Sequence, residues 1–176
     1  MLACRQSFCD TGRPEIGVLE LLSTEQGLVA ILFCGDRRSP ASEAWRSRNV
    51  GSVVPARPGE HEPYEEQLRA YFAGTRTLFT FALHRTGTPF QRAVLDAVSR
   101  VPHGGRASYQ AIAREVGAPA ASRAVGAANA RNPLPIVIPC HRVVGSSGRL
   151  TGYGGGLDAK EWLLAHEVRS GAARAA

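Results

Sequence analysis

Nine residues late in the chain, residues 136–144, constrain the fold more than any other stretch. They form an apolar, largely β-branched run that follows Pro135 and is broken by Pro139. Proline lacks the donor that a sheet ladder needs and favours extended geometry in the residue before it. β-branched residues favour strands as well. The segment therefore predicts a short buried strand that ends at Cys140, where the chain leaves the core.

Cys140 is followed at once by His141 and Arg142, two side chains that can carry positive charge. Neighbouring cations lower the pKa of a thiol, and the thiolate is the nucleophilic form of cysteine. The sequence thus predicts a reactive cysteine with a low pKa. A buried structural cysteine beside a surface His-Arg pair would give the same pattern, and these nine residues leave both interpretations open.

The positive charge of the chain comes almost wholly from arginine. Among 176 residues the formal net charge is +6, and Lys160 is the only lysine. Arginine contacts phosphate through a planar fork and stacks on bases, so this composition favours a nucleic-acid partner. Codon bias with an ordinary solvated surface would produce part of the same excess. The hydrophobic content of 44% suffices for one substantial core or two small ones.

The four cysteines follow neither a disulfide nor a metal-binding pattern. Cys4, Cys9, Cys34 and Cys140 are irregularly spaced and include no Cys-x-x-Cys pair, so we expect no bound metal. No stretch reaches membrane-spanning length, and the first residues lack an apolar run of the signal type. A cytoplasmic protein in a reducing compartment is therefore expected, in which a free Cys140 can persist.

The first half of the chain predicts a small α/β unit with three strands and one helix. Turn residues between the first two strands indicate a β-hairpin, and Gly74 ends the helix. The expected strands are residues 16–22, 28–33 and 78–83, and the expected helix is residues 64–73. Residues 1–14 show no periodic signal and predict a mobile arm. Residues 35–59 are rich in Arg, Ser, Pro and Gly and predict a loop.

The second half is predicted to be mainly helical. Apolar residues repeat at helical spacing from Phe90 to Val98. Ser108 can cap a helix over residues 109–116, and a further helix over residues 120–130 follows almost at once. Two helices so closely joined predict a helix-turn-helix.

The expected helix 120–130 carries almost no bulk, because most of its residues are alanine or glycine. Its backbone can therefore approach another surface closely, and Ser122 and Arg123 add polar reach. With the basic charge of the chain, this favours docking on DNA, and small residues suit the narrow minor groove. A thin helix packed inside the protein is the alternative.

A glycine-rich loop and a last helix follow the Cys140 segment. Glycines around Tyr153 let the backbone approach a ligand closely, although a flexible linker has the same composition. Asp158 can cap a helix over residues 159–167, whose apolar stripe ends at Glu167. A carboxylate that faces a core needs a partner, and His141 is the candidate. A frayed helix end in water is the alternative.

Several motifs together resemble one known family, the 6-O-alkylguanine-DNA alkyltransferases, also called methylated-DNA-protein-cysteine methyltransferases. The likeness covers most of the chain and is most specific in the second half. The motifs are Gly87-Thr88-Pro89-Phe90-Gln91, Ser108-Tyr109-Gln110, Arg123-Ala124-Val125-Gly126, Asn132-Pro133, Pro139-Cys140-His141-Arg142-Val143 and Gly152-Tyr153-Gly154-Gly155-Gly156-Leu157.

The resemblance implies two domains. Residues 1–85 would form a ribonuclease-H-like α/β domain, with a small antiparallel sheet plus a helix. Residues 86–167 would form a mainly α domain with a winged-helix-like helix-turn-helix, and residues 168–176 a disordered tail. Such proteins bind double-stranded DNA by the minor groove, flip out the alkylated guanine and transfer its alkyl group irreversibly to a cysteine. No cofactor and a monomer are implied, while cooperative binding along DNA stays open.

Roles come with the resemblance by position. Cys140 resembles the alkyl acceptor, and His141 with Glu167 resembles the relay that removes the thiol proton through a bridging water. Successive residues of a strand point to opposite faces, so a water bridge or a turn is needed to bring the imidazole to the sulfur. Arg123 resembles the finger that fills the vacated base stack. Tyr109 resembles the residue that pushes the phosphate and protonates the leaving guanine.

The remaining matches concern the base and the DNA backbone. Asn132 resembles an organising residue between the helix-turn-helix and the active-site strand. Tyr153 and Gly154 resemble a lid over the base, and the backbone of Val143 would help to read the guanine edge. Weaker DNA-contacting candidates are Gln91, Gln110, Ser122 and Ser146.

Two departures from the family pattern concern a metal and one acidic residue. Thr24 and Val29 stand where zinc-binding relatives have Cys and His, so no structural zinc is predicted. Asp96 stands where many members carry an aromatic residue, which the sequence does not explain. Two rival classes are a recognition protein that lacks the acceptor cysteine, which Cys140 argues against, and a Cys-His hydrolase, for which the DNA-binding motifs would have no purpose.

Overall fold

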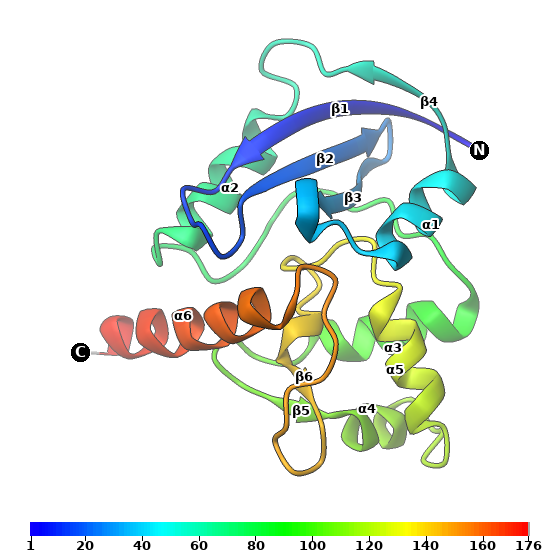
Figure 1. Ribbon diagram of the computed structural model, residues 1–176, viewed down its shortest axis with the longest axis vertical. Helices are drawn as coiled ribbons and strands as arrows, with labels where there is room; N and C mark the ends of the chain where they lie inside the picture. Colours follow the sequence, from blue (N-terminus) through cyan, green and yellow to red (C-terminus); the bar gives the residue numbers. More distant parts are fainter. Residues whose placement is uncertain (176) are drawn as a thin grey trace.

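The computed structural model describes residues 1–175, in which a four-stranded sheet precedes a group of helices (Figure 1). The sheet has the order β3-β2-β1-β4. Its neighbours are antiparallel except for β1 and β4, which run parallel. The strands are β1 (Leu2–Asp10), β2 (Val18–Thr24), β3 (Gly27–Phe33) and β4 (Val50–Pro55).

β2 and β3 form the predicted hairpin. Every residue of β3 is buried, because the strand contributes to two clusters of apolar side chains. Leu28, Ile31 and Phe33 join the main core, which continues into the helices. Ala30 and Leu32 join a smaller cluster, against which Trp45 of α1 (Pro40–Asn49) packs. Side chains of the hairpin therefore pack in both apolar clusters, one shared with the helices of the second half and one beside α1.

The predicted mobile arm at residues 1–14 is wrong, because residues 2–10 form β1 between β2 and β4. Cys4 and Cys9 point into the two clusters and are almost fully buried. Polar residues between the two cysteines interrupt the apolar alternation, so the sequence pattern did not reveal the strand. Gln6 donates to the buried carboxylate of Glu20 at 2.6 Å, so a polar side chain here is part of the sheet.

The predicted loop at residues 35–59 is also wrong. It contains a short 3-10 turn (Gly35–Arg37), α1 and β4. Ser39 caps α1 by accepting the backbone N–H of Ser42 at 3.2 Å, and Pro40 occupies the first helical turn, where its missing N–H costs nothing. The helix has no fully buried residue, so it lacks the strong apolar stripe that would have revealed it.

The strand predicted at residues 78–83 is not formed. Only Leu83 makes a bridge, to Leu28, while Phe79 and Phe81 pack against the main core from an irregular segment. The alternating apolar pattern therefore indicated correctly that these side chains pack against the core, but the segment forms no sheet ladder. The helix predicted at residues 64–73 is confirmed as α2 (Glu62–Phe72), with Leu68, Tyr71 and Phe72 buried.

The helical second half is confirmed, and it contains the predicted helix-turn-helix. Thr88 and Gln91 close a capping box at the start of α3, and Ser108 caps α4 by accepting the N–H of Ala111 at 3.0 Å. The short strands β5 and β6 pair in parallel beside these helices. The elements are α3 (Pro89–Ser99), β5 (Ala107–Ser108), α4 (Tyr109–Glu115), α5 (Ser122–Ala130), β6 (Val143–Val144) and α6 (Leu157–Ala175).

The strand predicted at residues 136–144 is largely wrong. Only β6 is extended, and a 3-10 turn, η2 (Cys140–Arg142), precedes it. Ile136 has a φ of 74°, which a β-branched residue adopts only under constraint, and the N–H of Ile138 returns to the carbonyl of Leu134 at 2.8 Å. The two prolines therefore bound a buried turn rather than a strand.

The predicted disordered tail at residues 168–176 is wrong for most of its length, because α6 continues through Ala175; Ala176 lies outside the described residues. Figure 1 shows α6 running below the sheet, alongside the segment that holds η2. Within residues 1–175 no helix is long and apolar enough to cross a membrane.

Candidate active site

The 3-10 turn η2 places Cys140, His141 and Arg142 on successive corners of one buried turn. All three are at most 7% exposed. A turn rather than a strand removes the alternation of faces that would have separated the imidazole from the thiol. The resemblance required either such a turn or a water bridge between His141 and Cys140, and the apolar pattern of the sequence did not reveal the turn.

Two asparagines hold this turn from the end of α5. Asn132 donates to the carbonyl of Ile138 at 2.9 Å and accepts the N–H of Leu134 at 3.0 Å, and it also hydrogen-bonds the thiol of Cys140. Asn129 is buried and donates to the carbonyl of Cys140 at 3.3 Å. The structure thus gives Asn132 an organising position. Asn129 was missed, although a polar residue among the small apolar residues that follow Arg123 was a usable signal.

Burial raises the pKa of the Cys140 thiol above its ordinary value of 9.0, although the hydrogen bond from Asn132 and the charge of Lys160 act in the opposite direction. The low-pKa thiolate expected from the neighbouring cations is therefore wrong for the resting protein. His141 is buried and uncharged at neutral pH, and Arg142 is paired elsewhere, so neither supplies the expected field. At pH 7 Cys140 is a thiol that must lose its proton before it reacts.

Lys160, on α6, is a second residue that the sequence did not identify. It is fully buried and its ammonium donates to the carbonyls of Val143 at 2.7 Å and Thr151 at 3.2 Å. Burial lowers the pKa of Lys160, while the nearby Cys140 acts to raise it. The ammonium joins β6 to the loop that follows it and lies close enough to Cys140 to favour the thiolate.

His141 and Glu167 form the predicted pair. Nε2 of His141 lies 2.9 Å from Oε1 of Glu167, and both side chains are fully buried. Glu167 is the end of the apolar stripe on α6, and the interpretation that placed it in water is excluded. An ionised carboxylate can only accept, so Nε2 carries the hydrogen and donates. Burial lowers the pKa of His141 despite this bond, which keeps the ring neutral.

Glu167 accepts from three further groups. Arg142 donates to it twice, through Nε at 2.9 Å and Nη2 at 2.8 Å. The hydroxyl of Tyr71 donates to Oε1 at 2.7 Å, and the backbone N–H of Gly104 donates to Oε2 at 3.0 Å. Burial alone would raise the pKa of Glu167, but the hydrogen bond from His141 and the guanidinium of Arg142 hold it well below its ordinary value of 4.5. The carboxylate is therefore a fixed anion that orients His141.

The remaining ring nitrogen of His141, Nδ1, is buried and makes no hydrogen bond to any residue of the described chain. With Nε2 protonated, Nδ1 carries a lone pair. A buried acceptor of this kind, on the residue that follows Cys140 in the same turn, can take the thiol proton directly or through one water.

A small cavity of about 20 Å³ lies beside Cys140. It is enclosed by α5 on one side and by the glycine-rich loop with Tyr153 and Gly154 on the other. Tyr153 packs edge-on against Phe33 of β3, with ring centroids 5.7 Å apart. Gly155 comes so near Phe33 that any side chain there would clash with the ring. The loop is therefore a packed cover and not a free linker.

The other predicted site residues lie on the outer face of the helix-turn-helix and its surroundings. Arg123, Gln110 and Ser146 are exposed, and Ser122 begins α5. Gln91 is engaged in the cap of α3, where its side chain accepts the N–H of Thr88 at 2.9 Å. None of these residues contacts the Cys140 turn in the structure.

Tyr109 bridges the helix-turn-helix and the covering loop. Its hydroxyl lies 2.8 Å from that of Thr151. Val143, predicted to read a base through its backbone, pairs with β5 and accepts from the ammonium of Lys160 through its carbonyl.

The positions that departed from the family pattern have structural partners. The hydroxyl of Thr24 lies 2.8 Å from Nδ1 of His84, and Val29 is buried in the sheet. Asp96, which the sequence left unexplained, forms an ion pair with Arg85. Within the described chain no three His, Cys, Asp or Glu side chains come together in a way that could hold a metal ion.

Comparison with known families matches both halves of the chain. Residues 10–84 match the ribonuclease-like domain of 6-O-methylguanine DNA methyltransferase, and residues 89–169 match its DNA binding domain. A methylated-DNA–protein-cysteine methyltransferase of Mycobacterium leprae is 55% identical over 156 residues, which cover 89% of each chain. One of Methanosarcina acetivorans is 41% identical over 150 residues, which cover 85% of this chain and 90% of the relative.

Solved structures agree with this assignment. OGT of Mycobacterium tuberculosis in complex with DNA gives a TM-score of 0.78 at 38% identity, and the match covers 96% of this chain and 94% of that one. The O6-methylguanine-DNA methyltransferase of Pyrococcus kodakaraensis gives a TM-score of 0.61 at 27% identity, with coverage of 95% and 99%. From sequence motifs, fold and the geometry around Cys140 alike, the chain belongs to the 6-O-methylguanine DNA methyltransferase family.

Proposed function

We propose that Cys140 accepts the alkyl group from 6-O-alkylguanine in duplex DNA, in a single irreversible event that restores guanine. The relatives are methylated-DNA–protein-cysteine methyltransferases, and this chain is such a transferase of DNA repair. The observation that supports the acceptor role is the turn that places Cys140 beside a cavity, with the His141–Glu167 pair buried behind it.

The reaction follows from the protonation states at rest. Nδ1 of His141 takes the thiol proton, directly or through one water, and Glu167 stabilises the resulting imidazolium. The thiolate then attacks the alkyl carbon of the lesion, so that a sulfur–carbon bond forms and the carbon–oxygen bond breaks. The electron pair goes to guanine, which is a better leaving group when it gains a proton. No step regenerates the thiol, so each molecule reacts once.

Base flipping from the minor groove is part of this proposal. Extrusion costs a few kcal/mol, and an inserted guanidinium can offset that cost. Arg123 is suited to this because it is exposed at the first turn of α5. Tyr109 lies between the helix-turn-helix and the covering loop, where its hydroxyl can approach both the phosphate and the base. Gln110 and Ser122 are the neighbours of these two residues in the chain, and with the exposed Ser146 they would contact the DNA backbone.

The covering loop must move for the base to enter. A cavity of about 20 Å³ holds one water molecule but no purine. Tyr153 and Gly154 form one wall of it, so opening requires the contact between Tyr153 and Phe33 to shift. The same wall would then cover the bound base. Val143 would contact the guanine edge through its backbone.

We also propose the domain division expected from the sequence, with residues 1–85 and 86–167 as its two parts. The proposed active site draws on both. Tyr71 and Phe33 come from the first part, and the Cys140 turn comes from the second. The protein is proposed to act as a monomer on DNA.

Mass spectrometry of the intact protein tests the acceptor role. After incubation with a duplex that contains one 6-O-methylguanine, we expect a mass gain of one methyl group per molecule, mapped to Cys140. Cys140→Ser should show no gain, while the matched control Cys34→Ser should gain one methyl. A methyl group on another residue would refute the role of Cys140. No methyl group despite tight binding to the lesion would refute the proposal and point to a recognition protein. Continued turnover would instead indicate a hydrolase.

A further inference from the structure

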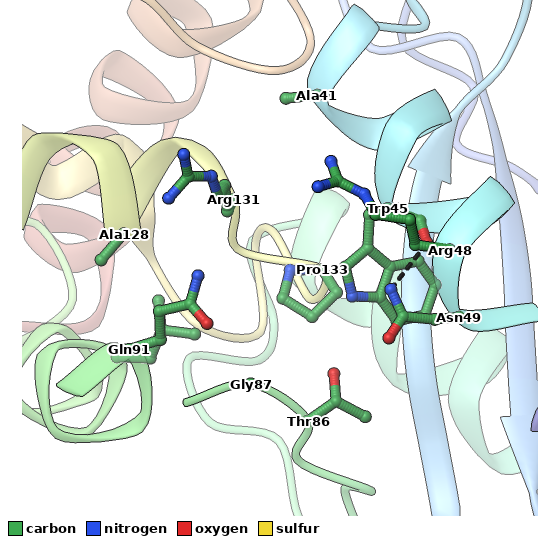
Figure 2. A pocket seen from close by; sticks show the side chains of 11 residues that line it. Ala41, Trp45, Arg48, Asn49, Thr86, Gly87, Gln91, Ala128, Arg131 and Pro133 are labelled. Atoms are coloured by element: carbon green, nitrogen blue, oxygen red, sulfur yellow. Dashed lines mark hydrogen bonds between the residues drawn. The ribbon is translucent and has the colours of Figure 1, made fainter. Parts of the chain in front are cut away.

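A second, larger cavity of about 230 Å³ lies between α1 and the chain that leaves α5. Figure 2 shows it from close by: α1 supplies one wall, and the end of α5 with the following segment supplies the opposite wall. Its polar lining comes from Arg48 and Asn49 of α1, Gln91 of α3 and Arg131, while Trp45 and Pro133 provide apolar surface. Nothing in the proposed reaction uses this cavity.

The charge of the cavity is positive and unbalanced. Arg48 and Arg131 are both exposed, and no carboxylate lines the cavity. Within the described residues neither guanidinium forms an ion pair, whereas Arg46 on the same helix is paired with the buried Glu20. Arg48 is oriented through its Nε, which donates to the carbonyl of Ala44 at 2.9 Å, so its terminal nitrogens remain available. Two unpaired guanidinium groups at one cavity favour an anionic ligand.

The cavity adjoins the proposed base-binding site. At the end of α5 and just after it, Asn129, Ala130 and Asn132 line the cavity beside Cys140. Their neighbours in the chain, Ala128, Arg131 and Pro133, line this second cavity. The two cavities therefore lie on two sides of one short stretch of chain. A DNA strand whose nucleotide reaches Cys140 must carry its flanking phosphates past that stretch.

We propose that this cavity binds a backbone phosphate of the strand that carries the flipped nucleotide, with Arg48 and Arg131 as its ligands. The inference rests on the proposed function, since it requires the lesion strand to be held at Cys140. Phosphate contacts of this kind fix the register of a protein on DNA without reading its sequence. The contact would also make α1, from the first half of the chain, part of the DNA-binding surface.

The salt dependence of DNA binding tests the inference. Affinity for a duplex with one 6-O-methylguanine is measured by fluorescence anisotropy at several KCl concentrations, in the Cys140→Ser background so that no transfer occurs. Each phosphate contact contributes about 0.9 to the slope of log affinity against log salt. We expect Arg131→Ala and Arg48→Ala each to bind several-fold more weakly, with a slope smaller by up to that amount.

The double variant and the controls sharpen this test. Because one phosphate is shared, the double variant should lose no more than about 0.9 in slope, the contribution of a single phosphate. Arg131→Lys should retain the slope of the parent, and Arg57→Ala, which removes an equal charge from the far loop before α2, should change neither slope nor affinity. Unchanged binding in both alanine variants, or additive slope losses near 1.8, would overturn the inference.

Chemical neutralisation of the DNA locates the contact. A methylphosphonate replaces the phosphates around the lesion one at a time, and at one position the difference between the parent and Arg131→Ala should vanish. If no position has this effect, the inference is wrong. A site for free inorganic phosphate would instead show phosphate-dependent thermal stabilisation with unchanged DNA binding, which also overturns it. If the wild-type protein takes up no methyl group, the proposed function itself fails.

Discussion

Replacing Glu167 by glutamine should destabilise the protein strongly, because it removes the carboxylate that, among the described residues, balances the buried guanidinium of Arg142. The side chain of Arg142 is 8% exposed and that of Glu167 is 0% exposed. Breaking a buried pair by removing one partner costs about 3–5 kcal/mol. This is a large part of the roughly 5–15 kcal/mol that stabilises a typical domain. For a chain of this length it corresponds to a drop of roughly 6–20 °C in Tm.

The stability that Glu167→Gln loses relative to wild type should depend on pH in a defined direction. The pKa of Glu167 lies well below its ordinary value of 4.5 in the folded protein. A carboxyl group of this kind stabilises the fold above its unfolded pKa, and that contribution is lost as the pH falls through the folded pKa. The stability gap between wild type and Glu167→Gln should therefore be complete at pH 7. It should narrow as the pH falls below about 4.5.

Urea denaturation followed by tryptophan fluorescence measures this gap at pH 7 and at about pH 4. The matched control is Glu161→Gln, an exposed carboxylate on the same helix, which should change the free energy of unfolding by less than about 0.5 kcal/mol. If the free energy of unfolding of Glu167→Gln lies within about 1 kcal/mol of the wild-type value at pH 7, the anion is not needed to balance Arg142 and the reasoning fails.

Three further predictions concern the same site. Tyr71→Phe should cost about 1.5–3 kcal/mol of unfolding free energy, the contribution of a hydrogen bond to a charged group, and a loss below 0.5 kcal/mol would contradict it. Asn132→Ala should slow methyl transfer by misplacing the Cys140 turn, as measured in single-turnover quench experiments, and an unchanged rate would argue against a positioning role. Because burial raises the pKa of Cys140, the transfer rate should increase as the pH rises from about 7 to 9, and a flat profile would show that thiol ionisation does not limit the reaction.

The sequence predicted the elements with local signals and missed those whose evidence is tertiary. The hairpin, α2, α3 and the helix-turn-helix have turn or capping residues that act within a few positions, such as Ser108 at α4. β1 and α1 lack a clear apolar period, because Gln6 and Arg46 are polar yet bond to the buried Glu20. The local signal that α1 does have, the cap by Ser39 followed by Pro40, was not recognised. The partners of a buried charge come from distant positions in the chain, so a periodic pattern cannot show them.

The candidate site divides in the same way. The motif around Cys140 identified the residues of the turn but not its shape, and the stripe on α6 identified Glu167, because both are local patterns. Tyr71, Asn129 and Lys160 were missed. Each looks unremarkable in its own helix and becomes part of the site only when the helices pack together. The low pKa expected for Cys140 was wrong for a related reason. In the folded protein Arg142 is paired with Glu167 and His141 is neutral, so neither neighbour in sequence supplies the positive charge that was expected.

The hydroxyl of Tyr71 shows how the first half of the chain enters the chemistry of the second. It shares Oε1 of Glu167 with His141 and Arg142, so three donors compete for one oxygen. Burial lowers the pKa of His141 and outweighs the opposing effect of Glu167, while the charges of Arg142 and Lys160 act in the same direction as burial, so the ring is neutral at rest. A neutral ring with a free Nδ1 is the state that can accept the thiol proton. Through Tyr71, the sheet-bearing half of the protein helps to hold the carboxylate that orients this ring.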